Sequence, residues 1–217
     1  MRKSLIIIVL SGITIIMLLS ILYFYISNKD VYSSYNKINI KDILIQDEEE
    51  YLVYFYMKDC YDCRIIEKDF IENTNKLKCN IYVVDLNEWG NVGDAYNWQK
   101  HHRDYDKEIG EIDKNGNKVF YTNESESKYI DGNLKDKNNK KISYEIIESD
   151  TEYLEKNSNA KLGKIYAMNN TPYIDINIIN GEELKIPGVP MLLKVLKNEI
   201  KEFYFDYEVL EYFENIS

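Results

Sequence analysis

Cysteine is scarce in this sequence, with three residues in a chain of 217. A disulfide-stapled mini-domain needs more cysteines in a shorter chain, so that class of protein is excluded. Basic residues are also few, since 27 Lys and Arg stand against 37 Asp and Glu and leave a formal charge of -10. Phosphate binding needs clustered Lys and Arg, so we expect no nucleic-acid partner.

The longest uncharged run lies near the N-terminus, from Leu5 to Ile26. As a helix it would be about 33 Å long, the thickness of a bilayer's hydrocarbon core. Arg2 and Lys3 precede it, so the positive-inside bias places the N-terminus in the cytoplasm and the rest of the chain outside. We therefore expect an uncleaved membrane anchor at residues 1–27 and a polar tether at residues 28–40. The alternatives are a cleaved signal peptide, which usually has a shorter apolar region, and a buried core helix.

The spacing of apolar residues changes twice between residues 51 and 86. Tyr51–Met57 is a run of aromatic and β-branched residues, typical of a strand buried on both faces. The spacing then becomes helical, with Ile66 and Phe70 on one face. Asn80–Leu86 is again typical of a buried strand. Together they predict a β-α-β unit with parallel strands and a right-handed crossover.

The remainder of the chain divides into an irregular stretch and an ordered end. Residues 87–187 keep some apolar periodicity and have little Pro or Ser bias, which favours a structured insertion over a linker. The elements expected from here on are strands at 118–121, 142–147 and 173–179, a helix near 151–156, hairpin strands at 191–196 and 200–205, and a terminal helix at 207–215.

The residues Cys60-Tyr-Asp-Cys63 stand where the first predicted strand gives way to the helix. A cysteine at a helix N-terminus meets the positive end of the helix dipole, which favours the thiolate that attacks disulfides. With two residues between them, Cys63 can reach Cys60 and resolve a mixed disulfide. A lone CxxC is also half of a zinc site, but a CxxC between a buried strand and a helix is more typical of redox chemistry.

Two segments of the sequence resemble the thioredoxin family. VYFYMKDCYDC, from Val53 to Cys63, is similar to the family's strand-to-CxxC signature, and Gly188-Val189-Pro190 is similar to its cis-proline loop. The resemblance covers about residues 38–87 and 187–217. It implies that Cys60 is the nucleophile, that Cys63 is the resolving thiol, that the Val189 backbone binds the substrate strand and that Pro190 positions it. In layout the chain is most similar to small membrane-tethered members that act outside the cytoplasm, including those that accompany bacteriocin export.

The expected fold is therefore α/β. The resemblance implies a central mixed sheet flanked by helices, spanning residues 41–217 and interrupted by the insertion at about 87–187. The expected function is thiol-disulfide exchange on exported proteins, with no bound cofactor. Its partners would be exported thiols and disulfides, a membrane or extracytoplasmic redox partner, and the membrane itself through residues 5–26. The expected location is a cell membrane, with a single span and the C-terminal domain outside.

The sequence departs from the family pattern around the cysteines. Tyr54 stands where thioredoxins keep a buried acid that helps to deprotonate the second cysteine, and Asp59 replaces the usual Trp. Asp59 and Asp62 bring negative charge to both sides of Cys60, which opposes its thiolate form, while Lys58 and Arg64 act the other way. A less stable thiolate favours a reductase or isomerase over an oxidase.

Several alternatives stay open at this point. The chain could be a non-catalytic interaction module for an export or membrane partner, or the two cysteines could form a structural disulfide or part of a zinc site. Pro172 could be the cis-proline instead of Pro190, if a helix rather than a hairpin follows Pro190. Cys79 is expected to be a buried, inert thiol, and the adjacent His101 and His102 to lie at the surface rather than bind metal.

Overall fold

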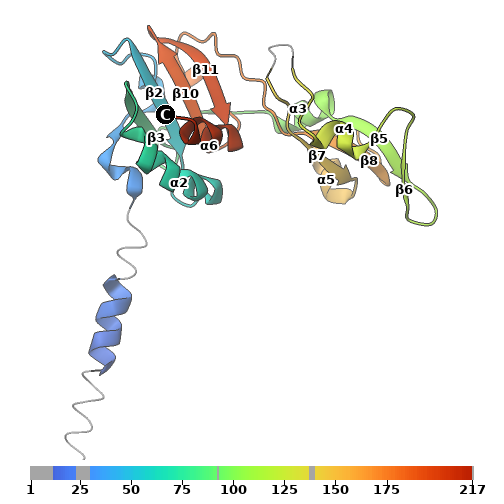
Figure 1. Ribbon diagram of the computed structural model, residues 1–217, viewed down its shortest axis with the longest axis horizontal. Helices are drawn as coiled ribbons and strands as arrows, with labels where there is room; N and C mark the ends of the chain where they lie inside the picture. Colours follow the sequence, from blue (N-terminus) through green and yellow to red (C-terminus); the bar gives the residue numbers. More distant parts are fainter. Residues whose placement is uncertain (1–11, 23–29, 92, 137–139, 217) are drawn as a thin grey trace, which may run out of the picture. The chain divides into compact units, whose positions relative to one another are not determined.

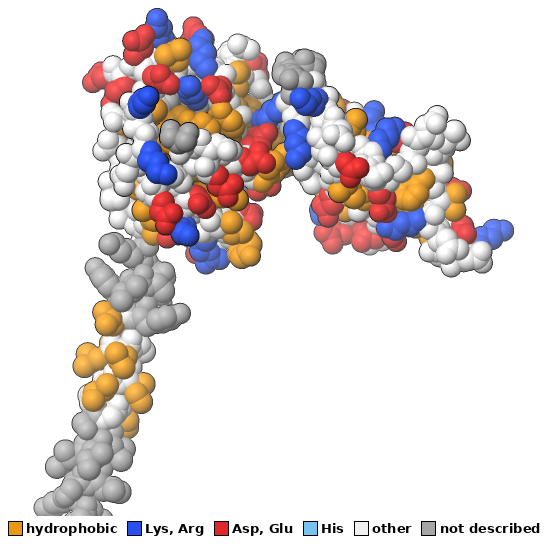
Figure 2. Space-filling model, in the orientation of Figure 1, with side chains coloured by type: hydrophobic (Ala, Val, Ile, Leu, Met, Phe, Trp, Pro, Cys, Tyr) orange, Lys and Arg blue, Asp and Glu red, His pale blue; other side chains and the backbone are white. Residues whose placement is uncertain are grey.

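The computed structural model describes residues 12–22, 30–91, 93–136 and 140–216, which fall into two compact units, 1–36 and 37–217. In the first unit, residues 12–22 are helical and their large apolar side chains are more than half exposed (Figures 1 and 2). The expected span Leu5–Ile26 lies in part outside the described residues. Within the described part, no helix combines the length and the apolar character needed to cross a bilayer. The first unit also contains a short 3-10 helix, η1 (Val31–Ser34).

The second unit is built on a five-stranded mixed sheet in the order β1-β3-β2-β10-β11 (Figure 1). The parallel pair β2 and β3 confirms the predicted strand pairing, and β10 runs antiparallel to both β2 and β11. Lys197 and Asn198, both with positive φ, form the predicted turn between β10 and β11. The strands are β1 (Asn36–Lys37), β2 (Glu50–Tyr56), β3 (Asn80–Asp85), β10 (Met191–Leu196) and β11 (Glu199–Phe205).

Two helices, α2 (Tyr61–Thr74) and α6 (Tyr207–Glu214), pack together on one face of this sheet (Figure 1). Alternate β2 residues point to opposite faces, and Tyr54 is on the face that meets the helices. Its ring lies 4.8 Å from the ring of Phe70 on α2 and 6.3 Å from that of Phe213 on α6. These fully buried aromatic rings hold the helices against the sheet.

The opposite face of the sheet buries three β2 residues, Tyr51, Val53 and Phe55, with their register partners on β10. It is covered by two 3-10 helices, η2 (Ile40–Asp42) and η3 (Gly181–Glu183), and by the extended residues 174–178. Of the described residues, none forms an α-helix in this core. The mixed α/β class is confirmed, but the expected helical flanks are found on one face only.

The segment between β3 and the cis-proline loop contains a four-stranded antiparallel sheet in the order β6-β5-β8-β7. The short parallel pair β4 (Asp94–Ala95) and β9 (Lys185–Ile186) brings the start and the end of the segment together. Its other elements are α3 (Trp98–Tyr105), β5 (Lys107–Ile112), β6 (Lys118–Phe120), α4 (Glu126–Ile130), β7 (Tyr144–Glu148), α5 (Thr151–Lys156) and β8 (Lys164–Asn169).

The two faces of this second sheet have separate small cores. On β8, Ile165 and Ala167 pack with Tyr129 of α4, whereas Tyr166 and Met168 pack with Tyr153 of α5. The predicted strands at 118–121 and 142–147 and the predicted helix at 151–156 are found close to these positions. The predicted strand at 173–179 is wrong, because these residues pair with no neighbouring strand.

Candidate redox site

Cys60 and Cys63 form a disulfide at the start of α2. Cys60 is the N-cap residue of the helix, and its Sγ accepts a hydrogen bond of 3.0 Å from the backbone N–H of Cys63. Cys63 is buried, whereas Cys60 keeps partial contact with solvent. The more accessible cysteine is thus the one at the N-cap, the positive end of the helix dipole.

The loop before β10 lies against this disulfide. Val189 and Pro190 are joined by a cis peptide bond. No other cis bond occurs in the part of the chain that the structure describes, so Pro172, the alternative candidate, is not a cis-proline. The carbonyl oxygen of Val189 lies 3.5 Å from Cys60 Sγ. All four residues singled out from the sequence, Cys60, Cys63, Val189 and Pro190, are therefore neighbours.

Carboxylate side chains lie around the Cys60–Cys63 disulfide and the cis-proline loop. Asp59 and Asp62 are exposed beside Cys60, and Asp206, which the sequence reasoning missed, donates its backbone N–H to Pro190 O at 3.0 Å. The pKa of Asp206 is raised, first by partial desolvation of its carboxyl group and second by the negative charge of Asp62. Such a field disfavours further negative charge, including a thiolate.

Below the helix, the sheet has aromatic side chains at the position where thioredoxins keep a buried acid. Tyr54 and Tyr56 stack with their ring centroids 6.3 Å apart and are both fully buried. One buried carboxylate, Asp85, lies at the end of β3, where it accepts a 3.4 Å hydrogen bond from Tyr56 Oη and pairs with Lys37 Nζ at 3.5 Å.

The loop that follows β3 runs beside the loop that leads to Cys60. Lys58 N–H donates to Asn87 Oδ1 at 3.1 Å, and Leu86 N–H donates to Tyr56 O at 3.0 Å. Trp89, in this loop, is fully exposed. Sequence reasoning missed this neighbour, although parallel strands end at the same edge of a sheet and the loop's position follows from that rule.

His101 and His102 are buried, so their expected surface position is wrong. Their helix α3 packs against β8, and each of the two rings contacts polar groups. His101 is hydrogen-bonded to Tyr96 Oη at 2.7 Å and to Asn169 O at 3.0 Å, and His102 Nδ1 lies 3.2 Å from Asp106 Oδ1. Within the described residues, no cluster of His, Cys, Asp and Glu could hold a metal ion.

Cys79 is a free thiol and only half-buried, which corrects the expected full burial. Its pKa is raised, first by desolvation and then by the charge of Glu50. It lies just before β3, at the opposite end of that strand from Cys60 and Cys63.

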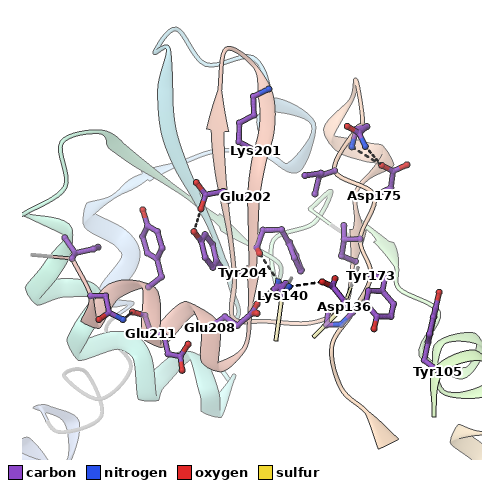
Figure 3. Close-up of a pocket in the computed structure, with 18 residues that line it drawn as sticks. Tyr105, Asp136, Lys140, Tyr173, Asp175, Lys201, Glu202, Tyr204, Glu208 and Glu211 are labelled. Carbon is purple, nitrogen blue, oxygen red and sulfur yellow. Dashed lines mark hydrogen bonds and ion pairs between the residues drawn. The ribbon is translucent and has the colours of Figure 1, made fainter. Parts of the chain in front are cut away.

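A groove of about 1470 Å³ lies between β11, α6 and residues 172–177 (Figure 3). Lys140 enters it from the insertion, donates to Phe203 O at 3.1 Å and pairs with Glu208 at 2.8 Å. None of the lining residues belongs to the CxxC pair or to the cis-proline loop. The groove is therefore separate from the candidate redox site.

Comparisons with family models, curated proteins and solved structures found no match to this chain. Its function must be inferred from the chemistry of the site itself.

Proposed function

We propose that this chain is a membrane-tethered thiol-disulfide oxidoreductase that acts on exported proteins through Cys60 and Cys63. One observation carries the proposal: in a disulfide at a helix N-terminus, the sulfur of the more accessible cysteine lies 3.5 Å from the carbonyl oxygen of a cis-proline loop. A structural disulfide that closes so short a loop contributes little chain entropy, so stability alone is a weak reason for it. The mixed sheet order and the cis-proline also support the thioredoxin-like fold that the sequence resembles.

In the reducing direction, the Cys60 thiolate attacks one sulfur of a client disulfide. The client S–S bond breaks, a Cys60–client mixed disulfide forms, and the second client sulfur leaves as a thiolate that takes a proton from water. Cys63, deprotonated by water, then attacks Cys60 Sγ and releases the first client sulfur as a thiol. Two electrons pass from the dithiol to the client, and an external dithiol partner returns them.

The charges around the pair favour this direction over oxidation. The helix dipole and the N–H of Cys63 stabilise a Cys60 thiolate, but Asp59, Asp62 and Asp206 oppose it. A thiolate that is only moderately stable gives a reductase or isomerase, because strong oxidants owe their potential to a very stable reduced form. A reduction potential near that of strong oxidants, about -120 mV, would contradict this direction.

The proposed location is the outer side of a cell membrane. Support comes from the uncharged run Leu5–Ile26, the preceding Arg2 and Lys3, and the exposed apolar side chains of residues 12–22. Exported proteins would then be the clients, and a membrane or extracytoplasmic dithiol the electron donor. The chemistry needs no bound cofactor.

The activity can be tested with the full chain in a Cys79→Ala background, which removes the third thiol. With dithiothreitol as the electron donor and a disulfide-bonded protein as the substrate, we expect Cys60→Ala to lower the reduction rate at least about 100-fold. Cys63→Ala should keep the first attack and accumulate mixed disulfides with clients, visible on non-reducing gels. Cys79→Ala alone should retain the parent rate.

Equal rates for Cys60→Ala and its parent would contradict the proposal and leave the alternative of a non-catalytic interaction module. Accumulation of mixed disulfides by Cys60→Ala rather than by Cys63→Ala would reverse the assigned roles of the two cysteines.

A further inference from the structure

Trp89 is presented to solvent in full, with 101 % relative exposure. A tryptophan side chain usually buries a large apolar area, and exposed tryptophans are typical of contact sites. Two other exposed side chains with apolar surface lie on the segment that carries the disulfide, Met57 at 38 % and Tyr61 at 69 %. A large side chain without a described ring or hydrogen-bond contact thus stands near the redox pair.

The loop that carries Trp89 is fixed on both sides of it. Asn87 Oδ1 holds Lys58 N–H, and Glu88 pairs with Lys37 at 3.3 Å. Asn91, fully buried, accepts from Ile40 N–H at 3.1 Å and donates to Asp85 O at 3.0 Å. Because hydrogen bonds and an ion pair fix the residues on both sides of Trp89, its exposed position is set by the structure of the loop.

The loop's contacts also bound the distance to the cysteine. Lys58 is two residues from Cys60 and Asn87 two residues from Trp89, and the hydrogen bond between them is 3.1 Å long. Two residues span at most about 7 Å, so the two Cα atoms lie within about 20 Å, the length of about six extended residues. One extended client segment can therefore reach both groups.

We propose that Trp89 binds an apolar side chain of the client, within about six residues of the client cysteine that Cys60 attacks. This inference rests on the proposed function. The occupant is a polypeptide rather than an anionic lipid surface, because the neighbouring carboxylates, Asp59, Asp62, Glu88 and Asp206, outnumber the neighbouring cations, Lys37, Lys58 and Arg64. The acidic rim favours clients that carry Lys or Arg near the same cysteine.

The test uses the reduced full chain in a Cys79→Ala background and cysteine peptides activated as mixed disulfides with 2-nitro-5-thiobenzoate. Attack on the peptide sulfur forms a Cys60–peptide disulfide and releases a coloured thiolate. Two peptides carry Phe, one three residues before its cysteine and the other three residues after it, and a matched peptide for each carries Ser in place of Phe. We expect kcat/KM to be at least about fivefold higher for one of the Phe peptides, as one buried aromatic contact can supply.

Trp89→Ala should abolish this preference, Trp89→Phe should keep most of it, and Leu162→Ala, a 60 % exposed control on the insertion, should keep all of it. All of these variants should react equally with the small reagent 5,5'-dithiobis(2-nitrobenzoate), which has no apolar peptide side chain. A preference that survives Trp89→Ala would overturn the inference. Equal release by Cys60→Ala and its parent would instead contradict the proposed function.

Tryptophan fluorescence separates a client from a lipid partner. The full chain is reconstituted in phosphatidylcholine vesicles, and the Phe peptide is added in its mixed-disulfide form. We expect the tryptophan emission of the parent to shift to shorter wavelength. Trp89→Phe, which keeps only Trp98, should show no such shift. The inference would be overturned if the parent's emission were blue-shifted before any peptide is added and Trp89→Phe lacked this shift. That result would show that Trp89 is inserted in the membrane.

Discussion

His101 makes its two hydrogen bonds best as a neutral ring. Its Nε2–H must donate to the carbonyl of Asn169, which leaves Nδ1 to accept from Tyr96 Oη, and that oxygen itself accepts from Tyr173 N–H at 3.1 Å. Burial lowers the pKa of His101, because the charged ring is desolvated. Protonation would therefore cost stability in the folded state.

This predicts a pH dependence of the free energy of unfolding. The unfolded chain binds the proton near the ordinary value of 6.5 and the folded chain only at lower pH, so His101's contribution is complete above pH 6.5 and declines below it. From pH 6.5 to 5.5 the loss is at most about 1.4 kcal/mol. Urea unfolding at pH 7.5 and 5.5 should show a smaller difference for His101→Gln, and the same difference in both proteins would contradict this. The carboxyl groups with lowered pKa values, such as Glu108, titrate below this window.

At the scale of the element, the β10–β11 turn depends on two residues with positive φ, Lys197 at 53° and Asn198 at 62°. Asn tolerates this region, whereas a β-branched side chain clashes with the backbone there. We expect Asn198→Val to lower the free energy of unfolding by about 1–2 kcal/mol and Asn198→Gly to change it by less than about 0.5 kcal/mol. Urea denaturation measures both. An exposed strand position, Lys201→Val, is the control and should be close to neutral.

The elements that the sequence predicted are those whose pattern is complete within their own residues. The apolar run of β2, the helical spacing of α2 and the Lys197-Asn198 turn each carry their own signal. Residues 173–179 also alternate like a strand, and Ile174, Ile176 and Ile178 do pack against the core. A strand further requires a neighbour with unpaired backbone groups, and no local pattern indicates whether one is present.

The polar helix α3 illustrates the opposite error. Its sequence, WQKHHRDY, has the composition of a surface helix, yet both histidines are buried. His101 contacts Asn169 only because α3 packs against β8, whereas His102 contacts Asp106, which is four residues further along the chain. The strand, the helix and the Gly188-Val189-Pro190 motif predicted that Cys60, Cys63, Val189 and Pro190 lie close together, whereas Asp206 has no local signal at all.

At the scale of the molecule, the insertion is fastened to the edge strand of the first sheet. Lys140 Nζ binds Phe203 O and Glu208, and Glu208 in turn accepts from Phe205 N–H at 3.1 Å. An uncovered edge strand invites pairing with other chains, so this ion pair also protects β11.

A double-mutant cycle with Lys140→Met and Glu208→Gln measures this attachment. Both side chains are partly buried, so we expect a coupling free energy of about 0.5–1.5 kcal/mol, larger than for an exposed pair. The pair Lys156 and Glu152, on the surface of α5, is the control and should couple by no more than about 0.5 kcal/mol. Both coupling free energies are measured by urea unfolding. Equal values in the two cycles would mean that the Lys140–Glu208 ion pair does not attach the insertion to the first sheet.

Because Cys79 is a free thiol, the number of thiols that react in the chain reports whether the Cys60–Cys63 disulfide is formed. With Cys60 and Cys63 joined, the chain offers one thiol to an alkylating reagent, and after reduction it offers three. Each added polymer-linked maleimide retards the chain on a denaturing gel, so the two states separate into two bands whose ratio can be read from intact cells. Because the third thiol reacts in both states, the oxidised band also carries a label, and unreacted chains stand apart from both.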